Sequence, residues 1–132
     1  MGSVNYLLDT HTLLWAALEE EKLSGSALKI IEDINAPLFV SAVSAYEIMF
    51  KHKIGKLDDY TFVVENYFDI LDRLGVKELP ISAKHAHFAG GFEWEHRDPF
   101  DRMLAAQAFT ENMTLISSDP EFKGLPWLSR LW

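Results

Sequence analysis

An apolar run meets an acidic residue in the segment Val4-Asn5-Tyr6-Leu7-Leu8-Asp9-Thr10-His11-Thr12. The residues before Asp9 suit a short buried strand, and the residues after it carry apolar side chains at helical spacing. Those apolar residues are Leu13, Leu14, Ala17 and Leu18. The segment therefore predicts a strand, an acidic residue at its carboxyl end, and a helix that begins at once.

Three other segments place an acidic residue in a similar position. Glu47 follows a predicted strand at residues 37–41 and lies about a turn and a half inside the next helix, so its carboxylate can point back toward the strand. Asp101 lies in residues 96–102, which open a long helix. Asp119 ends the strand predicted for residues 114–119. Four separate segments thus carry an acid where a strand gives way to a helix or turn.

The rest of the chain alternates between helical and extended patterns. Helices are predicted for residues 24–35, for residues 59–74 with Gly75 as the stop signal, and from Ser82 to residues 90–91, and a strand for residues 76–81. This alternation predicts an α/β fold with a mostly parallel central sheet and helices on its faces. At 132 residues and 48% apolar content, the chain fits one compact domain, which we expect to span residues 1–132.

Acidic residues at several strand ends can converge, because ligands of open α/β sheets gather outside the carboxyl ends of the strands. Carboxylates so close together repel one another unless protons or cations neutralise them. Mg²⁺ and Mn²⁺ suit ligation by oxygen alone, and the chain has no cysteine to attract softer metals. The candidate catalytic and metal-binding residues are Asp9, Glu47, Asp101 and Asp119.

Most of these acids also have a structural explanation. Asp101 suits the first turn of a helix dipole, and Asp119 suits the start of an Asp-Pro turn. Asp98, which precedes a proline, looks like the N-cap of the helix that carries Asp101. Asp9 is the exception, since an acid that ends a central strand so near the chain start seldom caps. The prediction of a site therefore depends on the joint pattern.

Glu47 has a structural alternative of its own. It matches a Ser44-x-x-Glu capping box, in which the glutamate would bond to the start of its helix. The helix more plausibly begins just after Ser41, which leaves Glu47 too deep in the helix to cap it. This boundary favours a functional role for the Glu47 carboxylate.

The net charge of −8 at first argues against a nucleic-acid partner, because lysine and arginine usually supply phosphate affinity. Several of the negative charges, however, belong to the predicted metal site and would be offset by bound cations. A basic rim near two of the site segments can steer a phosphate backbone, although a solvated helix face would explain it as well. The candidate RNA-binding residues in this rim are Lys51, Lys53, Lys56, Arg97 and Arg102.

Composition also bears on the compartment. No apolar run approaches the ~20 residues needed to cross a bilayer, and the amino terminus lacks a signal-peptide pattern. The absence of cysteine is compatible with a reducing cytoplasm, where we expect the protein to act. His85 and His87 point to different sides of a helix, so we interpret them as structural or surface residues.

The ordered motifs resemble the PIN domain, and more narrowly the VapC-type toxins of bacterial toxin–antitoxin pairs. The resemblance spans nearly the whole chain. It rests on Leu7-Leu8-Asp9-Thr10-His11, Ser41-Ala42-Val43-Ser44-Ala45-Tyr46-Glu47-Ile48, Gly55-Lys56-Leu57, Arg97-Asp98-Pro99-Phe100-Asp101-Arg102-Met103-Leu104-Ala105-Ala106-Gln107-Ala108 and Ile116-Ser117-Ser118-Asp119.

The resemblance implies a Mg²⁺- or Mn²⁺-dependent endoribonuclease with a PIN-like α/β/α sandwich. It implies a homodimer that cleaves RNA and is silenced by a VapB-like antitoxin. By position, Asp9, Glu47 and Asp101 match the core acids of the family, and Asp119 matches a more variable fourth acid. The supporting residues that the resemblance implies are Thr10, Asp98 and Ser117.

Two other readings stay open. A haloacid-dehalogenase-like phosphatase also has an acid after its first strand, but it needs a second acid two residues on, where this chain has His11. A non-catalytic PIN-fold binding or dimerisation module would explain the fold without four convergent acids. Large apolar side chains could form a dimer face and an antitoxin groove, or could belong to the core. They are Leu14, Trp15, Trp127, Leu128, Leu131 and Trp132.

Overall fold

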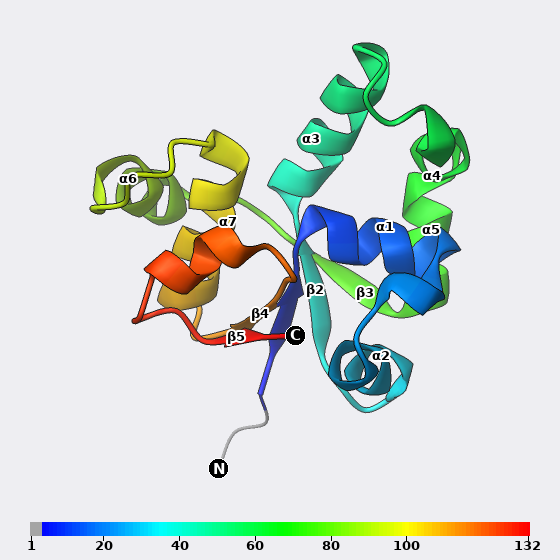
Figure 1. Cartoon of the computed structure of the whole chain (residues 1–132), viewed down its shortest axis with the longest axis horizontal. Helices are drawn as coiled ribbons and strands as arrows, with labels where there is room; N and C mark the ends of the chain where they lie inside the picture. Colours follow the sequence, from blue (N-terminus) through cyan, green and yellow to red (C-terminus); the bar gives the residue numbers. More distant parts are fainter. Residues whose placement is uncertain (1–3) are drawn as a thin grey trace.

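A central sheet of five parallel strands organises the computed structural model, which describes residues 4–132 (Figure 1). The spatial order is β3-β2-β1-β4-β5, and every neighbouring pair is parallel. The strands are β1 (Tyr6–Leu8), β2 (Leu38–Ser41), β3 (Val76–Leu79), β4 (Thr114–Ile116) and β5 (Arg130–Leu131). The predicted α/β class with a mostly parallel sheet is confirmed.

Helices cover both faces of this sheet, and Figure 1 shows α6 and α7 on one side and α1, α2 and α5 on the other. The chain follows β1 with α1 (Thr10–Leu18), η1 (Glu20–Lys22) and α2 (Gly25–Glu32). After β2 come α3 (Ala42–Lys53), η2 (Asp58–Tyr60), α4 (Thr61–Glu65) and α5 (Tyr67–Leu74). After β3 come α6 (Ala83–Gly91) and α7 (Pro99–Thr110), and η3 (Pro120–Gly124) links β4 to β5.

Successive residues of β1 divide the hydrophobic core into two layers. Leu8 packs with residues of α1, α2 and α5 on one face, while Leu7 packs with Leu104, Ala105 and Ala108 of α7 on the other. The division follows from the two-residue period of a strand, which sends successive side chains to opposite faces. Leu7 and Leu8 are both fully buried, as expected for the central strand of a parallel sheet.

The pairing register brings three strand ends to one level. Leu8 pairs with Val40 of β2 and with Ile116 of β4, so Asp9 follows β1 at the height where the other two strands end. The chain leaves β1 for β2 on one side and reaches β4 on the other, which makes this edge the topological switch point of the sheet. Open α/β sheets bind ligands at that place.

Two elements differ from the sequence prediction. The helix predicted for residues 59–74 is broken at Asn66, whose backbone amide and side-chain amide both donate to the carbonyl of Phe62. An asparagine side chain that bonds to the backbone competes with the helix, so α5 starts anew at Tyr67. The short strand β5 was not predicted. Gly75 ends α5 in the left-handed conformation, with φ of 67°, as predicted.

A search for membrane-spanning segments covered the described residues 4–132. None of their helices combines the length and the apolar character required to cross a bilayer.

Candidate metal centre

All four predicted acids line one cavity of about 280 Å³ at the carboxyl edge of the sheet. The acids come from four segments that are far apart in the sequence. The cavity is lined by Asp9, Thr10, His11, Trp15, Glu47, Asp101, Ser118, Asp119 and Pro120. The expected convergence is therefore present in the structure, but the prediction that each acid follows a strand is wrong for Asp101, which lies in α7 after helix α6 and a loop.

Asp9 is the N-cap of α1 and lies at the floor of the site. Its Oδ1 accepts a hydrogen bond of 2.8 Å from the backbone amide of Thr12, and the residue is only 7% exposed. Burial raises the pKa of Asp9, and hydrogen bonds from Ser117 and Thr12 oppose that rise in part. The expectation that Asp9 has no capping role is therefore wrong, and its carboxylate combines that role with an unfavourably buried charge.

Glu47 is buried on α3 and is surrounded by polar partners. Its Oε1 accepts a 2.6 Å hydrogen bond from Thr10, whose hydroxyl also lies 2.9 Å from that of Ser44. Its Oε2 forms an ion pair with Lys51, one helical turn later. Because α3 begins at Ala42 with Ser41 as its N-cap, Glu47 does not cap the helix, as predicted.

Lys51 therefore belongs to the site itself. Burial lowers its pKa, but the hydrogen bond to Glu47 and the charges of Glu47, Asp98 and Asp101 outweigh this effect, so that the pKa is raised overall. The ammonium group remains charged and partly neutralises the carboxylate cluster.

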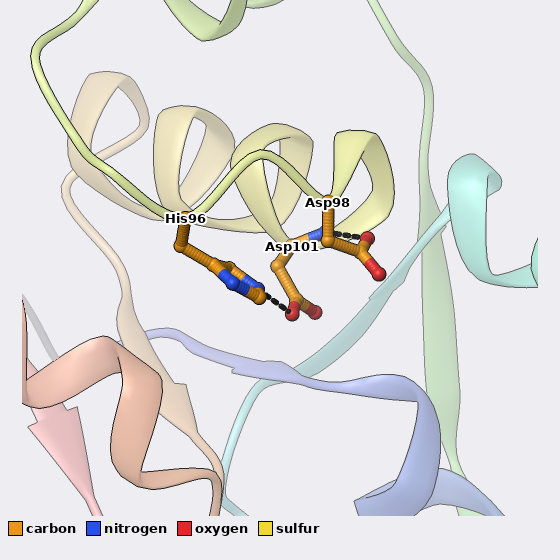
Figure 2. A group of neighbouring side chains, drawn as sticks. All are labelled: His96, Asp98 and Asp101. Atoms are coloured by element: carbon orange, nitrogen blue, oxygen red, sulfur yellow. Dashed lines mark hydrogen bonds and ion pairs between the residues drawn. The ribbon is translucent and has the colours of Figure 1, made fainter.

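Asp101, in the first turn of α7, carries a marked pKa shift. Burial and the negative charges of Asp98 and Asp119 raise its pKa to about 6, although a hydrogen bond from His96 lowers it in part. Figure 2 shows the His96 ring directed at Asp101, with Nε2 2.7 Å from Oδ2. The same hydrogen bond raises the pKa of His96. The main cause of the shift is burial, which disfavours the charged carboxylate, and the two neighbouring acids add to it.

His96, Asp98 and Asp101 are close enough for one ligand atom of each to lie within 4.8 Å of the others (Figure 2). His96 was not among the predicted site residues. It stands five positions before Asp101, at the start of the same motif, and that position was the signal that could have found it. Ser44, which links α3 to Thr10, was also missed as a site residue.

Asp98 is the N-cap of α7, as its position before Pro99 predicted. Its Oδ1 accepts hydrogen bonds from the backbone amides of Phe100, at 2.8 Å, and Asp101, at 3.1 Å. Asp119 caps η3 in the same way, accepting from the amide of Glu121 at 3.0 Å. Both residues therefore hold a structural role and also lie near or in the cavity.

Asp98→Ala is expected to lower the free energy of unfolding by about 1 kcal/mol, because the first turn of α7 loses its cap. Asp98→Asn keeps an oxygen acceptor and should stay near the wild-type value. Urea unfolding monitored by circular dichroism compares the two variants. A loss of stability that is equal in both would show that charge, rather than capping, is what Asp98 supplies.

The predicted basic rim divides into two groups. Lys53, Lys56 and Arg97 are exposed, whereas Lys51 is partly buried against Glu47. Arg102 does not fit the prediction that it binds RNA, because its guanidinium donates to the backbone carbonyls of residues in the preceding loop. Its donors are directed into the protein, so Arg102 is left out of the RNA contacts proposed below.

The large apolar side chains near the two chain ends differ in how far they are buried. Leu14 and Leu128 are buried in the two core layers, so of the two alternatives left open by the sequence, core packing holds for them. Trp15 and Trp132 are partly exposed and lie with ring centroids 5.8 Å apart. His85 is structural, as predicted: its Nδ1 accepts from the Ser82 amide at the start of α6.

The donors of the cavity fit a hard divalent cation. They are carboxylate oxygens, the class that Mg²⁺ and Mn²⁺ prefer. Burial raises the pKa of both Asp9 and Asp101, so the charged form of each carboxylate is unfavourable without a neutralising partner. The acids that line the cavity, and that we propose as ligands, are Asp9, Glu47, Asp101 and Asp119. Among the described residues, the group whose ligand atoms already lie within 4.8 Å of one another is a different one, His96, Asp98 and Asp101, which shares only Asp101 with that set.

Comparisons with known proteins agree with this architecture. One similar structure is that of VapBC2 from Rickettsia felis bound to a fragment of promoter DNA. A chain of it is 20% identical to this chain with a TM-score of 0.65, and the alignment covers 97% of this chain and 98% of that chain. A chain of DNA-bound VapBC from Salmonella typhimurium is 16% identical with a TM-score of 0.69, and 98% of each chain is covered. A chain of VapBC-1 from nontypeable Haemophilus influenzae is 19% identical with a TM-score of 0.61, and 97% of each chain is covered.

A comparison with curated proteins found no match. Residues 6–128 match the family model described as PIN domain, which spans nearly the whole chain and includes every acid of the cavity. The chain therefore belongs to the PIN domain family.

Proposed function

We propose that the protein is a metal-dependent endoribonuclease, the cytoplasmic toxin of a VapBC-type pair. The observation that carries the proposal is the cavity in which carboxylates from four separate segments meet. Two of these carboxylates, Asp9 and Asp101, are buried and have raised pKa values, and perturbed pKa values cluster at functional sites. Membership of the PIN family and the similarity to chains of VapBC complexes support the same function.

The proposed ligands of a Mg²⁺ or Mn²⁺ ion are Asp9, Glu47, Asp101 and Asp119. The ion would place positive charge beside the scissile phosphate and would lower the pKa of the attacking water. The other residues of the site orient these carboxylates. Thr10 donates a hydrogen bond to Glu47, Ser44 bonds to the Thr10 hydroxyl in turn, and Ser117 bonds to Asp9. Because water attacks, rather than a ribose hydroxyl, the expected products carry 5′-phosphate and 3′-hydroxyl ends.

Lys51 would act as a counter-charge at the edge of the site. Its ammonium group bonds to Glu47 and lies 5.8 Å from the centroid of the Phe100 ring. Together with the exposed Lys53, Lys56 and Arg97, it would guide the phosphate backbone of RNA toward the carboxylates.

Aromatic rings beside the carboxylates suit unpaired bases. Tyr46 precedes Glu47 on α3 and is 66% exposed. Its ring lies 5.8 Å from that of Phe100, the neighbour of Asp101, and 6.3 Å from that of Phe50. Proteins recognise single-stranded RNA by stacking bases on such rings. We therefore propose single-stranded regions of RNA as the substrate.

Tyr46→Ala is expected to raise KM for a single-stranded RNA at least about fivefold, because stacking of one base on an aromatic ring contributes ~1–3 kcal/mol. The value of kcat should change much less. Phe68→Ala is the matched control, since Phe68 is a similarly exposed ring on α5. Steady-state kinetics on a fluorescent oligonucleotide measures both variants; equal KM values in wild type and Tyr46→Ala would refute the stacking role.

The nuclease proposal is tested by incubating purified protein with RNA and Mn²⁺, with EDTA as the control. Cleavage that requires the metal and leaves 5′-phosphate ends supports the proposal. A protein that binds RNA without cutting it would be a non-catalytic PIN module. Release of phosphate from small phosphomonoesters, without cleavage of RNA, would support the phosphatase reading instead. Sequencing the 5′ ends of RNA fragments from expressing cells would identify the target.

The partner we propose is a VapB-like antitoxin, and an apolar groove beside the site suits it. The groove has a volume of about 520 Å³ and lies between α3, α4 and α5, where its lining includes Ile48, Met49 and Phe68. Antitoxin side chains would cover this groove while a basic residue reaches the carboxylates. Co-expression with the neighbouring gene tests this, and light scattering of the free protein tests the homodimer.

A further inference from the structure

Arg102 follows Asp101 on α7 and directs its guanidinium into the loop between α6 and α7. Nε donates to the carbonyl of Ala89 at 2.8 Å, Nη1 donates to those of Trp94 and His96 at 3.2 Å each, and Nη2 donates to that of Phe92. The guanidinium carbon lies 4.2 Å from the centroid of the Phe92 ring. One side chain therefore binds four carbonyls and one aromatic face.

The loop has few other backbone contacts. Within residues 4–132, the backbone hydrogen bonds outside helices and strands involve none of residues 93–97. Carbonyls inside a folded protein need partners, and for Trp94 and His96 the partner is Arg102. The path of residues 92–96 thus depends on this guanidinium and on side-chain packing.

That path sets the position of His96. The His96 ring packs against Trp94, with centroids 4.8 Å apart, and its Nε2 lies 2.7 Å from Oδ2 of Asp101. Trp94 in turn packs on Phe122. His96 therefore reaches Asp101 from a segment to which Arg102 is hydrogen-bonded. Figure 2 shows the His96 ring directed at Asp101.

We propose that Arg102 is a positioning residue for the metal centre: it holds residues 92–96 so that His96 fixes the orientation of the Asp101 carboxylate. The role of Arg102 in catalysis rests on the proposed function. Its effect on the position of His96 does not depend on that function. Groups that orient metal ligands typically change metal affinity or activity by about 10- to 100-fold when they are removed. Lysine cannot replace arginine here, because an ammonium group lacks the planar set of donors that reaches several carbonyls.

The test compares wild type with Arg102→Lys, His96→Ala and the double variant. Mn²⁺ affinity is measured by titration calorimetry, and the His96 ring nitrogens are observed by NMR. Arg102→Lys should lower Mn²⁺ affinity at least about tenfold and move the His96 signals toward those of a free imidazole. In the His96→Ala background the same substitution should add less than about twofold, because the two residues act in series.

Arg130→Lys is the matched control. Arg130 also donates to a carbonyl near the site, that of Ser117 at 2.9 Å, but within residues 4–132 it forms no hydrogen bond or ion pair with the loop of His96. It should leave the His96 signals unchanged. If Arg102→Lys does not fold, Phe92→Leu loosens the guanidinium while keeping every carbonyl, and it should shift the His96 signals in the same direction.

Unchanged His96 signals and Mn²⁺ affinity in Arg102→Lys would overturn the proposal, as would fully additive losses in the double variant. A wild-type protein that cleaves no RNA would count against the proposed function alone. The NMR and calorimetric results would still decide whether Arg102 acts through His96.

Discussion

Asp9→Asn is expected to lower RNA cleavage at least ~100-fold while the metal-free protein stays folded and no less stable than wild type. Asp9 is 7% exposed, and burial raises its pKa, so its negative charge is unfavourable in the absence of a cation. Asparagine removes this charge but keeps an oxygen that can accept the hydrogen bond from the Thr12 amide. Activity and stability should therefore change in opposite directions.

Cleavage assays with Mn²⁺ and thermal unfolding in EDTA measure the two effects. Asp33→Asn is the matched control, because Asp33 also accepts a backbone hydrogen bond, from Asn35, but is exposed and outside the cavity. Its activity should equal that of wild type. Full activity in purified Asp9→Asn protein would show that the cavity is not the catalytic site.

Mn²⁺ is expected to raise the Tm of the wild type by about 10 °C at pH 7.5, when present at ~100 times its dissociation constant, and by much less at pH 5. The pH dependence follows from Asp101, whose pKa burial and neighbouring carboxylates raise to about 6 from its ordinary 3.8. Below that pKa, the metal must displace a proton from the carboxyl group.

The raised pKa of Asp101 also determines whether the metal-free protein gains or loses stability as pH rises. A raised pKa means that the folded state binds the proton more tightly than the unfolded state, so stability falls as pH rises from about 4 to about 6. His96, whose pKa the hydrogen bond with Asp101 raises, acts in the same direction, since its contribution is lost as pH rises past its folded pKa. The metal should therefore stabilise the protein most where the metal-free form is weakest.

Differential scanning fluorimetry with Mn²⁺ or EDTA at both pH values measures these shifts. Asp9→Asn should show a much smaller metal effect at pH 7.5, because a ligand has been lost. Equal shifts in the two proteins, or a shift that does not depend on pH, would mean that the ion binds elsewhere.

The sequence predicted those parts of the fold whose conformation is determined by residues nearby in the chain. Residues 4–12 carry their own strand, acid and helix signals, and Gly75 marks the end of α5 through its left-handed conformation. β5 has no such local signal, since a strand of two residues exists only through its pairing with β4. The break at Asn66 depends on one side-chain hydrogen bond that competes with an otherwise regular helical pattern.

The candidate site likewise contains residues that could be predicted from the sequence and residues that could not. Asp9, Glu47 and Asp119 could be placed because each lies shortly after an apolar strand, and the parallel register brings these strand ends together. Asp101 could be placed only by its position in the first turn of α7. The partners of the long side chains could not be placed. From the sequence, both Lys51 and Arg102 belong to one predicted basic rim. In the structure, Lys51 forms an ion pair with Glu47, whereas Arg102 donates to backbone carbonyls. Tertiary packing selects among the partners that such flexible side chains can reach.

Three aspartates near the cavity, Asp9, Asp98 and Asp119, are also helix N-caps. Asparagine caps a helix as well as aspartate does, and a single nucleotide change converts an aspartate codon to an asparagine codon. A gene for this chain can thus lose a carboxylate at the cavity in one step while the helix keeps its cap. Under the function proposed above, such a variant would keep the apolar groove between α3 and α5 and would bind the antitoxin without cleaving RNA.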